Sequence, residues 1–149
     1  DGRKLKAVIP GGSSVPVLTG EMMMECTMDY DSITKAGSML GSGAVVIMDE
    51  TTDMVKALRR ISRFYFSESC GQCTPCREGT GWLYRVLCRI VDGKGRSEDI
   101  ELLEEVSHKI EGRTICALGD AAAMPVWSFI KHFRHEFQYY VDHKRSILS

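Results

Sequence analysis

Four of the six cysteines in this 149-residue chain are arranged like ligands of an iron–sulfur cluster. Cys70, Cys73 and Cys76 are separated by two residues each, so one loop could wrap three corners of a cubane. A [4Fe–4S] cubane needs a fourth thiolate, which can come from a distant part of the chain. Cys116 is the best candidate for it. The sequence therefore predicts one [4Fe–4S] cluster on these four cysteines, with a role in electron transfer and no catalytic residues.

The residues around these cysteines suit an anionic cluster. Arg77 follows a predicted ligand directly and would place positive charge beside it. Helices that begin after Cys76 and after Cys116 would point backbone N–H groups at the cluster. Nearby glycines would let the backbone approach the sulfur atoms closely, where N–H···S contacts tune the reduction potential. These glycines are Gly71, Gly79 and Gly119.

Two other interpretations of the cysteine pattern stay open at this point. A structural zinc site also uses four cysteines, although two separated C-x2-C pairs are its usual arrangement, and the chain would then be a zinc-stabilised interaction module with no redox role. Redox-active disulfides fit the spacing less well than either metal site. The chain could also exist as a metal-free fragment that has lost a labile cluster and is held together by its core.

The remaining chemically active side chains fit structural roles better. Cys26 and Cys88 are interpreted as small packing residues, and the Met22–Met24 run as flexible core or interface. The glycine-serine stretch 11–14 lacks the glycine-lysine-serine ending of a phosphate-binding loop. The histidines contain no H-x3-H pair and are expected to be solvated helix residues; they are His108, His132, His135 and His143.

Two amphipathic helices are expected on either side of the three-cysteine loop. After Thr51 the apolar residues recur every three or four positions, which predicts a helix that ends near Phe66. A second apolar stripe runs from Trp82 to Ile90, and the glycines in 92–95 suit its C-terminal end. The loop with Cys70, Cys73 and Cys76 joins these two helices.

Two more helices are expected on either side of Cys116. Ser97 is the predicted N-cap of the third helix, which stops at Gly112. The last helix should start near Asp120 or Ala121 and run to about 143–145. Four amphipathic helices with short links can bury their stripes only against one another, which predicts a four-helix bundle. In an antiparallel bundle the link with Cys116 lies at the same end as the three-cysteine loop.

The first 49 residues are expected to form a separate β-rich segment. Apolar runs at 5–10 and 44–48 are typical of strands, and 31–36 of a short helix. The stretch 19–43 is otherwise expected to be irregular, with turns at Gly37, Gly41 and Gly43. Two or three strands do not form a stable sheet alone, so further strands should come from elsewhere. The predicted fold is thus mostly α with a partial β segment, and the domains are 1–49 and 50–149.

Composition narrows the classes of function. The apolar fraction of 44% supports a buried core in one domain, or in one domain and a fragment. A formal charge of −1 provides no field that would gather nucleic acid or anionic lipid. No apolar run approaches a membrane span, and no signal-peptide pattern opens the chain, which is expected to be soluble and cytosolic. Because it starts without Met, we interpret it as a piece of a longer protein.

Taken together, these motifs resemble a known family. The chain is similar to the C-terminal part of the NADH-binding flavoprotein subunit (the F subunit) of bacterial respiratory complex I (NADH:quinone oxidoreductase). The strongest likeness lies in 69–79, SCGQCTPCREG, and in 115–121, ICALGDA. The stretch 6–14, KAVIPGGSS, resembles part of that family's β-grasp (ubiquitin-like) domain of the soluble-ligand-binding type. The resemblance spans the whole chain.

The resemblance implies an electron relay. In the family, the cysteines that match Cys70, Cys73, Cys76 and Cys116 hold a [4Fe–4S] cluster that accepts electrons from FMN after the flavin takes hydride from NADH. The flavin and NADH domain precedes the matching region, so FMN and NADH are expected only in the parent protein. This fragment should therefore lack NADH oxidation activity. NAD-linked hydrogenases and formate dehydrogenases contain a related module, which is the alternative assignment.

The resemblance also implies partners and a location. The fragment would contact its own flavin domain and other peripheral-arm subunits of complex I, without nucleic acid and without direct insertion into a membrane. The complex would hold it at the cytoplasmic face of the inner membrane. In that setting electrons pass from NADH towards quinone.

Overall fold

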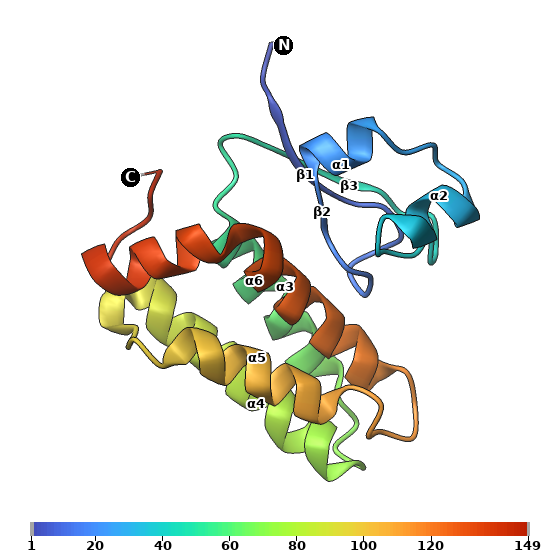
Figure 1. Ribbon diagram of the computed structural model, residues 1–149. Helices are drawn as coiled ribbons and strands as arrows, with labels where there is room; N and C mark the ends of the chain where they lie inside the picture. The colour runs from blue at the N-terminus through green and yellow to red at the C-terminus, as the bar shows by residue number, and fades with distance from the viewer. Residues whose placement is uncertain (1, 149) are drawn as a thin grey trace. The chain divides into compact units, whose positions relative to one another are not determined.

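The computed structural model describes residues 2–148, which form mostly helices and one small antiparallel sheet (Figure 1). The chain divides into two compact units, Asp1–Thr52 and Asp53–Ser149. This division comes after the turn that follows the last strand, a few residues beyond the boundary expected from the sequence. In the described part of the chain, no helix is both long and apolar enough to cross a membrane.

The first unit contains a three-stranded antiparallel sheet with the order β2-β1-β3. In the central strand, Val8 pairs with Leu18 on one side and with Ile47 on the other. Ala7, Val8 and Ile9 are buried, as expected for a strand with neighbours on both edges. The elements of this unit are β1 (Leu5–Ile9), β2 (Leu18–Thr19), α1 (Gly20–Met24), α2 (Tyr30–Lys35) and β3 (Val46–Asp49).

The sequence predicted β1, β3 and α2 to within a few residues but missed β2 and α1. Thr19 begins α1 because its hydroxyl accepts the N–H of Met22 at 3.2 Å, an N-cap that the methionine run obscured. The turns expected at Gly37, Gly41 and Gly43 are confirmed, because all three have positive φ angles.

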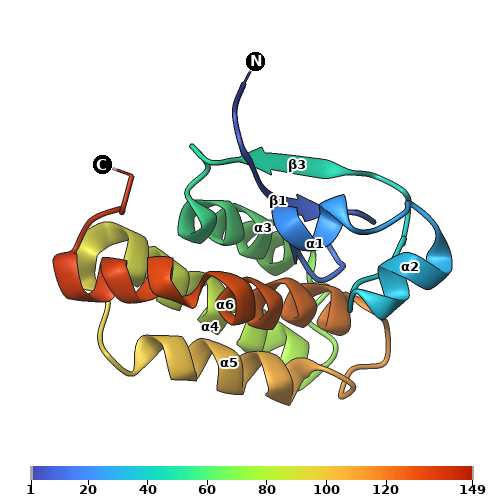
Figure 2. The ribbon, with the colours of Figure 1, turned by 45° about the horizontal axis from the view of Figure 1, so that its top comes forward.

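The second unit is built from four α-helices that pack in a ring. α3 (Met54–Glu68) contacts α4 (Thr74–Arg89) and α6 (Leu118–His143), while α5 (Asp99–Ile110) contacts the same two helices from the other side. Helices α4 and α6 also touch across the ring. A short π-helical turn, η1 (Ile90–Lys94), follows α4. Figures 1 and 2 show the α3–α4 loop and the α5–α6 link at the same end of this unit.

The apolar stripes of the four helices meet in one core. Helix α6 contributes most, since its apolar residues recur along the whole length of the helix. The largest side chains that are almost completely buried include Met54, Leu58, Leu83, Leu87, Ile90, Ile100, Leu103, Phe129 and Phe137. Most residues of the stripes that the sequence predicted are therefore buried, but Trp82, which was expected to begin the stripe of α4, is 51% exposed.

Two helix starts differ from the sequence-based expectation. Helix α4 begins at Thr74, with Cys73 as its N-cap, so Cys76 lies in the first turn instead of before the helix. Pro75 suits that turn because it needs no N–H partner there. Ser97 is not the N-cap of α5; Glu98 occupies that position, and the Ser97 hydroxyl donates to the Glu98 carboxylate.

Asp53 connects the beginning and the end of the second unit by hydrogen bonds. Its carboxylate accepts the N–H of Lys56 at 2.9 Å, which caps α3. It also accepts the hydroxyls of Tyr140 and Ser146, each at 2.6 Å. Burial raises the pKa of Asp53, but hydrogen bonds from Ser146, Tyr140 and the Lys56 backbone lower it more, so the pKa lies below its ordinary value of 3.8.

We expect Asp53→Asn to destabilise the second unit by about 1–2 kcal/mol at pH 7, because the amide nitrogen that replaces one carboxylate oxygen cannot accept the hydroxyls of Tyr140 and Ser146. A depressed pKa in the folded state provides stability above the unfolded pKa, and that stability is lost as the pH falls through the lower folded value. The melting temperature of the unmodified protein should thus fall more steeply below about pH 4 than that of Asp53→Asn. The control is Asp142→Asn, at an exposed carboxylate of α6. Parallel pH profiles for all three proteins would contradict this role of Asp53.

Candidate metal centre

The loop between α3 and α4 is shaped by the residues at its start. Ser69 ends α3 as its C-cap, and its N–H donates to the Tyr65 carbonyl at 3.1 Å. Gly71 then takes a φ of 79°, which favours glycine because it has no Cβ. The chain turns sharply here and re-enters a helix at Thr74, within the run that contains the three closely spaced cysteines.

The structure brings all four sequence-predicted cysteines to one cavity of about 130 Å³. Cys70, Cys73 and Cys76 come from the α3–α4 loop and the first turn of α4, and Cys116 comes from the α5–α6 link. Cys76 is buried, Cys73 is half-buried, and the other two are exposed. The other residues that line the cavity are Glu68, Gln72, Thr114 and Leu118.

The four donors that line the cavity are thiols, which are soft ligands of the kind that iron–sulfur clusters use. Within residues 2–148, no three His, Cys, Asp or Glu side chains are gathered in the way that one metal ion requires. The four thiols line the wall of one cavity. In a cubane each of the four cysteines binds a different iron, whereas four cysteines on zinc converge at about 2.3 Å from one point.

Among the described residues, two hydrogen bonds involve cysteine sulfur atoms of the site. The backbone N–H of Ile115 donates to Cys73 Sγ at 3.4 Å, so the α5–α6 link is tied directly to the three-cysteine loop. The hydroxyl of Ser69 lies 3.2 Å from Cys76 Sγ. Neither Ser69 nor Ile115 was identified from the sequence as part of the site. The signal available for Ser69 was its position at the end of a predicted helix, directly before Cys70.

Helix N-termini lie at the site: α6 begins after Cys116 as the sequence predicted, but α4 begins before Cys76 and not after it. The Cys73 side chain caps none of the N–H groups in the first turn of α4, and no side chain caps the start of α6 after Ala117. N–H groups and the positive end of the helix dipole therefore face the region of the thiols at the start of both helices. An anionic group held here would be stabilised.

Arg77 and Gly79 do not have the roles expected from the sequence, which were positive charge beside the cluster and close approach of the backbone to sulfur. The Arg77 guanidinium donates to the Gly71 carbonyl at 3.1 Å and to the Glu78 carboxylate at 3.0 Å, so it braces the loop and its charge is partly balanced. A Cβ at Gly79 would lie 2.6 Å from the Ile110 side chain. Gly79 thus permits close packing of α4 on α5 rather than backbone approach to sulfur.

Gly119 permits close packing of a different kind. A Cβ there would lie 2.3 Å from Thr114 Oγ1 and 2.6 Å from its methyl carbon, so only glycine fits against this side chain. Thr114 in turn donates its hydroxyl to the Cys116 carbonyl at 2.9 Å. The Asp120 carboxylate accepts the N–H of Gly112 at 2.7 Å and holds the other end of the link. The position of Cys116 is thereby fixed by its own loop.

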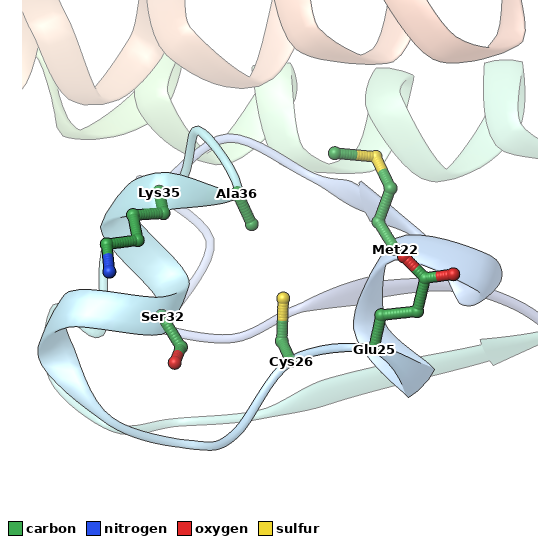
Figure 3. A pocket seen from close by; sticks show the side chains of 6 residues that line it. All are labelled: Met22, Glu25, Cys26, Ser32, Lys35 and Ala36. Atoms are coloured by element: carbon green, nitrogen blue, oxygen red, sulfur yellow. The ribbon is translucent and has the colours of Figure 1, made fainter.

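Cys26 and Cys88 lie outside this cavity. Cys26 belongs to the first unit, where it helps to line a separate hollow of about 330 Å³ with Met22, Glu25 and Lys35. Figure 3 shows its sulfur pointing into the space between α1 and α2. Cys88 lies in α4 and raises the pKa of the neighbouring Tyr84 through a hydrogen bond. The histidines likewise do not line the four-cysteine cavity.

Residues 56–140, which contain all four cysteines of the cavity, match the family described as the NADH-ubiquinone oxidoreductase-F iron-sulfur binding region. The chain belongs to this family. The resemblance to the F subunit and the cofactor class predicted from the cysteines are both confirmed by the match: this is an iron–sulfur binding region of the [4Fe–4S] kind. Which residues bind the cluster stays a prediction.

Individual relatives of the chain support the same family. The chain is 56% identical over 134 residues to the F subunit of NADH-quinone oxidoreductase in Rickettsia bellii, an alignment that covers 90% of this chain and 32% of that protein. It is 55% identical over 138 residues to the F 1 subunit of the same enzyme in Rhizobium meliloti, covering 93% of this chain and 32% of that protein. The chain therefore spans about a third of the length of the relatives that it matches.

Solved structures contain the same fold. A chain in the crystal structure of an NAD⁺-reducing [NiFe]-hydrogenase in its H2-reduced state superimposes with a TM-score of 0.77 at 26% identity. The match covers 93% of this chain and 24% of that chain. The air-oxidised state of such a hydrogenase gives a TM-score of 0.78 with the same identity.

Proposed function

We propose that Cys70, Cys73, Cys76 and Cys116 hold one [4Fe–4S] cluster through which electrons pass from a flavin towards quinone. The observation that carries this proposal is that the four thiols, from two segments about 40 residues apart, line one cavity. When bound, the cluster supplies reversible one-electron transfer. The protein supplies the four thiolates, two helix N-termini and two hydrogen bonds to sulfur.

In this proposal the second unit is a four-helix bundle that serves as a rigid frame for the site. The closed packing of α3, α4, α5 and α6 fixes the α3–α4 loop and the α5–α6 link at one end. The first unit is then the C-terminal portion of a β-grasp domain in a longer protein. FMN and NADH would bind to the part of that protein outside this chain, and this chain alone would not oxidise NADH.

The parent activity we propose is NADH:quinone oxidoreduction, as part of respiratory complex I. Its support is the identity of 55–56% to F subunits of NADH-quinone oxidoreductase, against 26% for the hydrogenase chain. The partners would be the flavin domain of the same protein and other peripheral-arm subunits. The complex would lie at the cytoplasmic face of the inner membrane, and the chain itself would not enter the bilayer.

Anaerobic reconstitution of the chain with iron and sulfide, and in parallel with zinc, tests the cofactor. We expect a brown protein with about four irons and four acid-labile sulfides per chain, which retains them through gel filtration. A colourless protein that rejects iron and sulfide but keeps one zinc per chain would instead support a structural zinc module. That outcome would overturn the proposed electron transfer.

A further inference from the structure

We propose that the Ser69 hydroxyl sets the reduction potential of the cluster by donating a hydrogen bond to the sulfur of Cys76. This inference rests on the proposed cluster and assigns a tuning role to a residue that is not itself a ligand. Its basis is the 3.2 Å contact between Ser69 Oγ and Cys76 Sγ.

The direction of this hydrogen bond follows from the chemistry of the two groups. In a free thiol either atom can be the donor, but a thiolate that binds iron carries no proton, so the serine must donate. The N–H of Gly71 donates to the same serine oxygen at 3.4 Å. Ser69 Oγ therefore accepts from Gly71, and its own O–H donates to the sulfur of Cys76. The result is a chain of two hydrogen bonds that ends on Cys76.

Ser69 is also held in place by its backbone. It is the C-cap of α3, where its N–H bonds to the Tyr65 carbonyl, and its side chain is half-buried. Cys76 is fixed within the first turn of α4, and its carbonyl accepts the hydroxyl of the buried Thr80 at 2.7 Å. Both partners are thus anchored by helix ends, so little freedom remains to be lost when the hydrogen bond forms.

The location gives this hydrogen bond particular weight. Cys76 is the one buried thiol of the four, with 7% of its surface exposed. A hydrogen bond away from water acts in a lower local dielectric and is electrostatically stronger. Reduction adds negative charge to the cluster and its thiolates, so a donor at this sulfur stabilises the reduced form more than the oxidised form. Ser69 therefore raises the potential.

The test compares variants of the reconstituted chain by redox titration, followed by electron paramagnetic resonance. We expect Ser69→Ala to shift the equilibrium about tenfold towards the oxidised cluster, which corresponds to a midpoint about 59 mV more negative for one electron. Ser69→Thr keeps the hydroxyl and should restore most of the potential, whereas the isosteric Ser69→Val should not. Ser67→Ala, at an exposed serine two residues earlier in α3, is the matched control and should leave the potential unchanged.

The outcomes separate this inference from the proposed function. If the unmodified chain binds no cluster, the proposed function fails first. If every variant binds the cluster with the same potential, the role of Ser69 is overturned while the cluster stands. If Ser69→Ala does not assemble a cluster, the comparison of Ser69→Thr with Ser69→Val decides: equal midpoints would overturn the inference, and a more negative midpoint for the valine variant would support it.

Discussion

Cys116→Ser is expected to lose most of its iron and sulfide, while Cys88→Ser should retain about four of each per chain. Cys116 is the ligand supplied by the α5–α6 link, and its thiol lines the same cavity as the other three. A serine hydroxyl is a harder ligand than a thiolate and stays protonated at neutral pH, so the fourth iron would be poorly held. Cys88 lies in α4, outside the cavity, and its replacement removes no ligand.

The measurement for this pair is iron and acid-labile sulfide per chain after anaerobic reconstitution and gel filtration, with circular dichroism to confirm that both variants keep their helices. Cys88→Ser controls for the loss of a thiol as such. Equal losses in the two variants, or full retention in Cys116→Ser, would contradict the ligand assignment. Full retention in Cys116→Ser would mean that another residue supplies the fourth ligand.

Gly119→Ala is expected to lower cluster content strongly although it removes no ligand. The added Cβ would lie 2.3 Å from Thr114 Oγ1, far inside normal contact, so Thr114 has to move. Thr114 holds the Cys116 carbonyl through its hydroxyl, and the neighbouring Ile115 N–H bonds to Cys73 Sγ. Overpacking of this kind costs about 1–3 kcal/mol, and here the displaced segment contains a predicted ligand.

A double substitution makes this prediction sharper. Thr114→Ala removes the hydroxyl and methyl that the new Cβ would meet, so Gly119→Ala combined with Thr114→Ala should recover part of the cluster content lost by Gly119→Ala alone. Gly95→Ala is the control: its Cβ would be crowded by Ile90 and Val141, near the end of α4 and away from the cysteines. A cluster content in Gly119→Ala equal to that in Gly95→Ala would show that the 114–116 segment does not position Cys116.

The cysteine set could be read from the sequence because its spacing carries the information. Three thiols at C-x2-C-x2-C spacing are unusual, and Cys116 follows from the order of four amphipathic helices, which places alternate links at one end. The structure brings the same four residues to one cavity. Hydrophobic periodicity also predicted α3, α5 and α6 to within about three residues, since each helix buries one apolar stripe.

The features that could not be predicted from the sequence depend on contacts between residues distant in the chain, or on competition between neighbouring residues for the same hydrogen bonds. Ser69 looks like any polar residue at a helix end, and its bond to Cys76 exists only because the Gly71 turn brings the chain back. Ser97 has the residue type of an N-cap, but Asp99, two residues later, accepts the N–H of Arg96 and pairs with Arg89 from α4. That ion pair fixes the entry into α5 and leaves Glu98 at the cap position.

The start of α4 could have been predicted from Pro75, but the prediction followed the apolar periodicity instead. Pro75 at the second helical position is a common helix-start residue, and it places Cys76 inside the first turn. The apolar stripe becomes regular only after Gly81, because the first turns of α4 carry the residues of the site. The residues of the site thus interrupt the apolar pattern by which the first turns of α4 could have been predicted.

Electron paramagnetic resonance of the reconstituted, dithionite-reduced chain tests the electron-transfer proposal most directly. We predict a spin-half signal of a reduced [4Fe–4S] cluster that integrates to about one spin per chain, because one cluster accepts one electron. A sample that contains stoichiometric zinc and gives no signal would contradict the account.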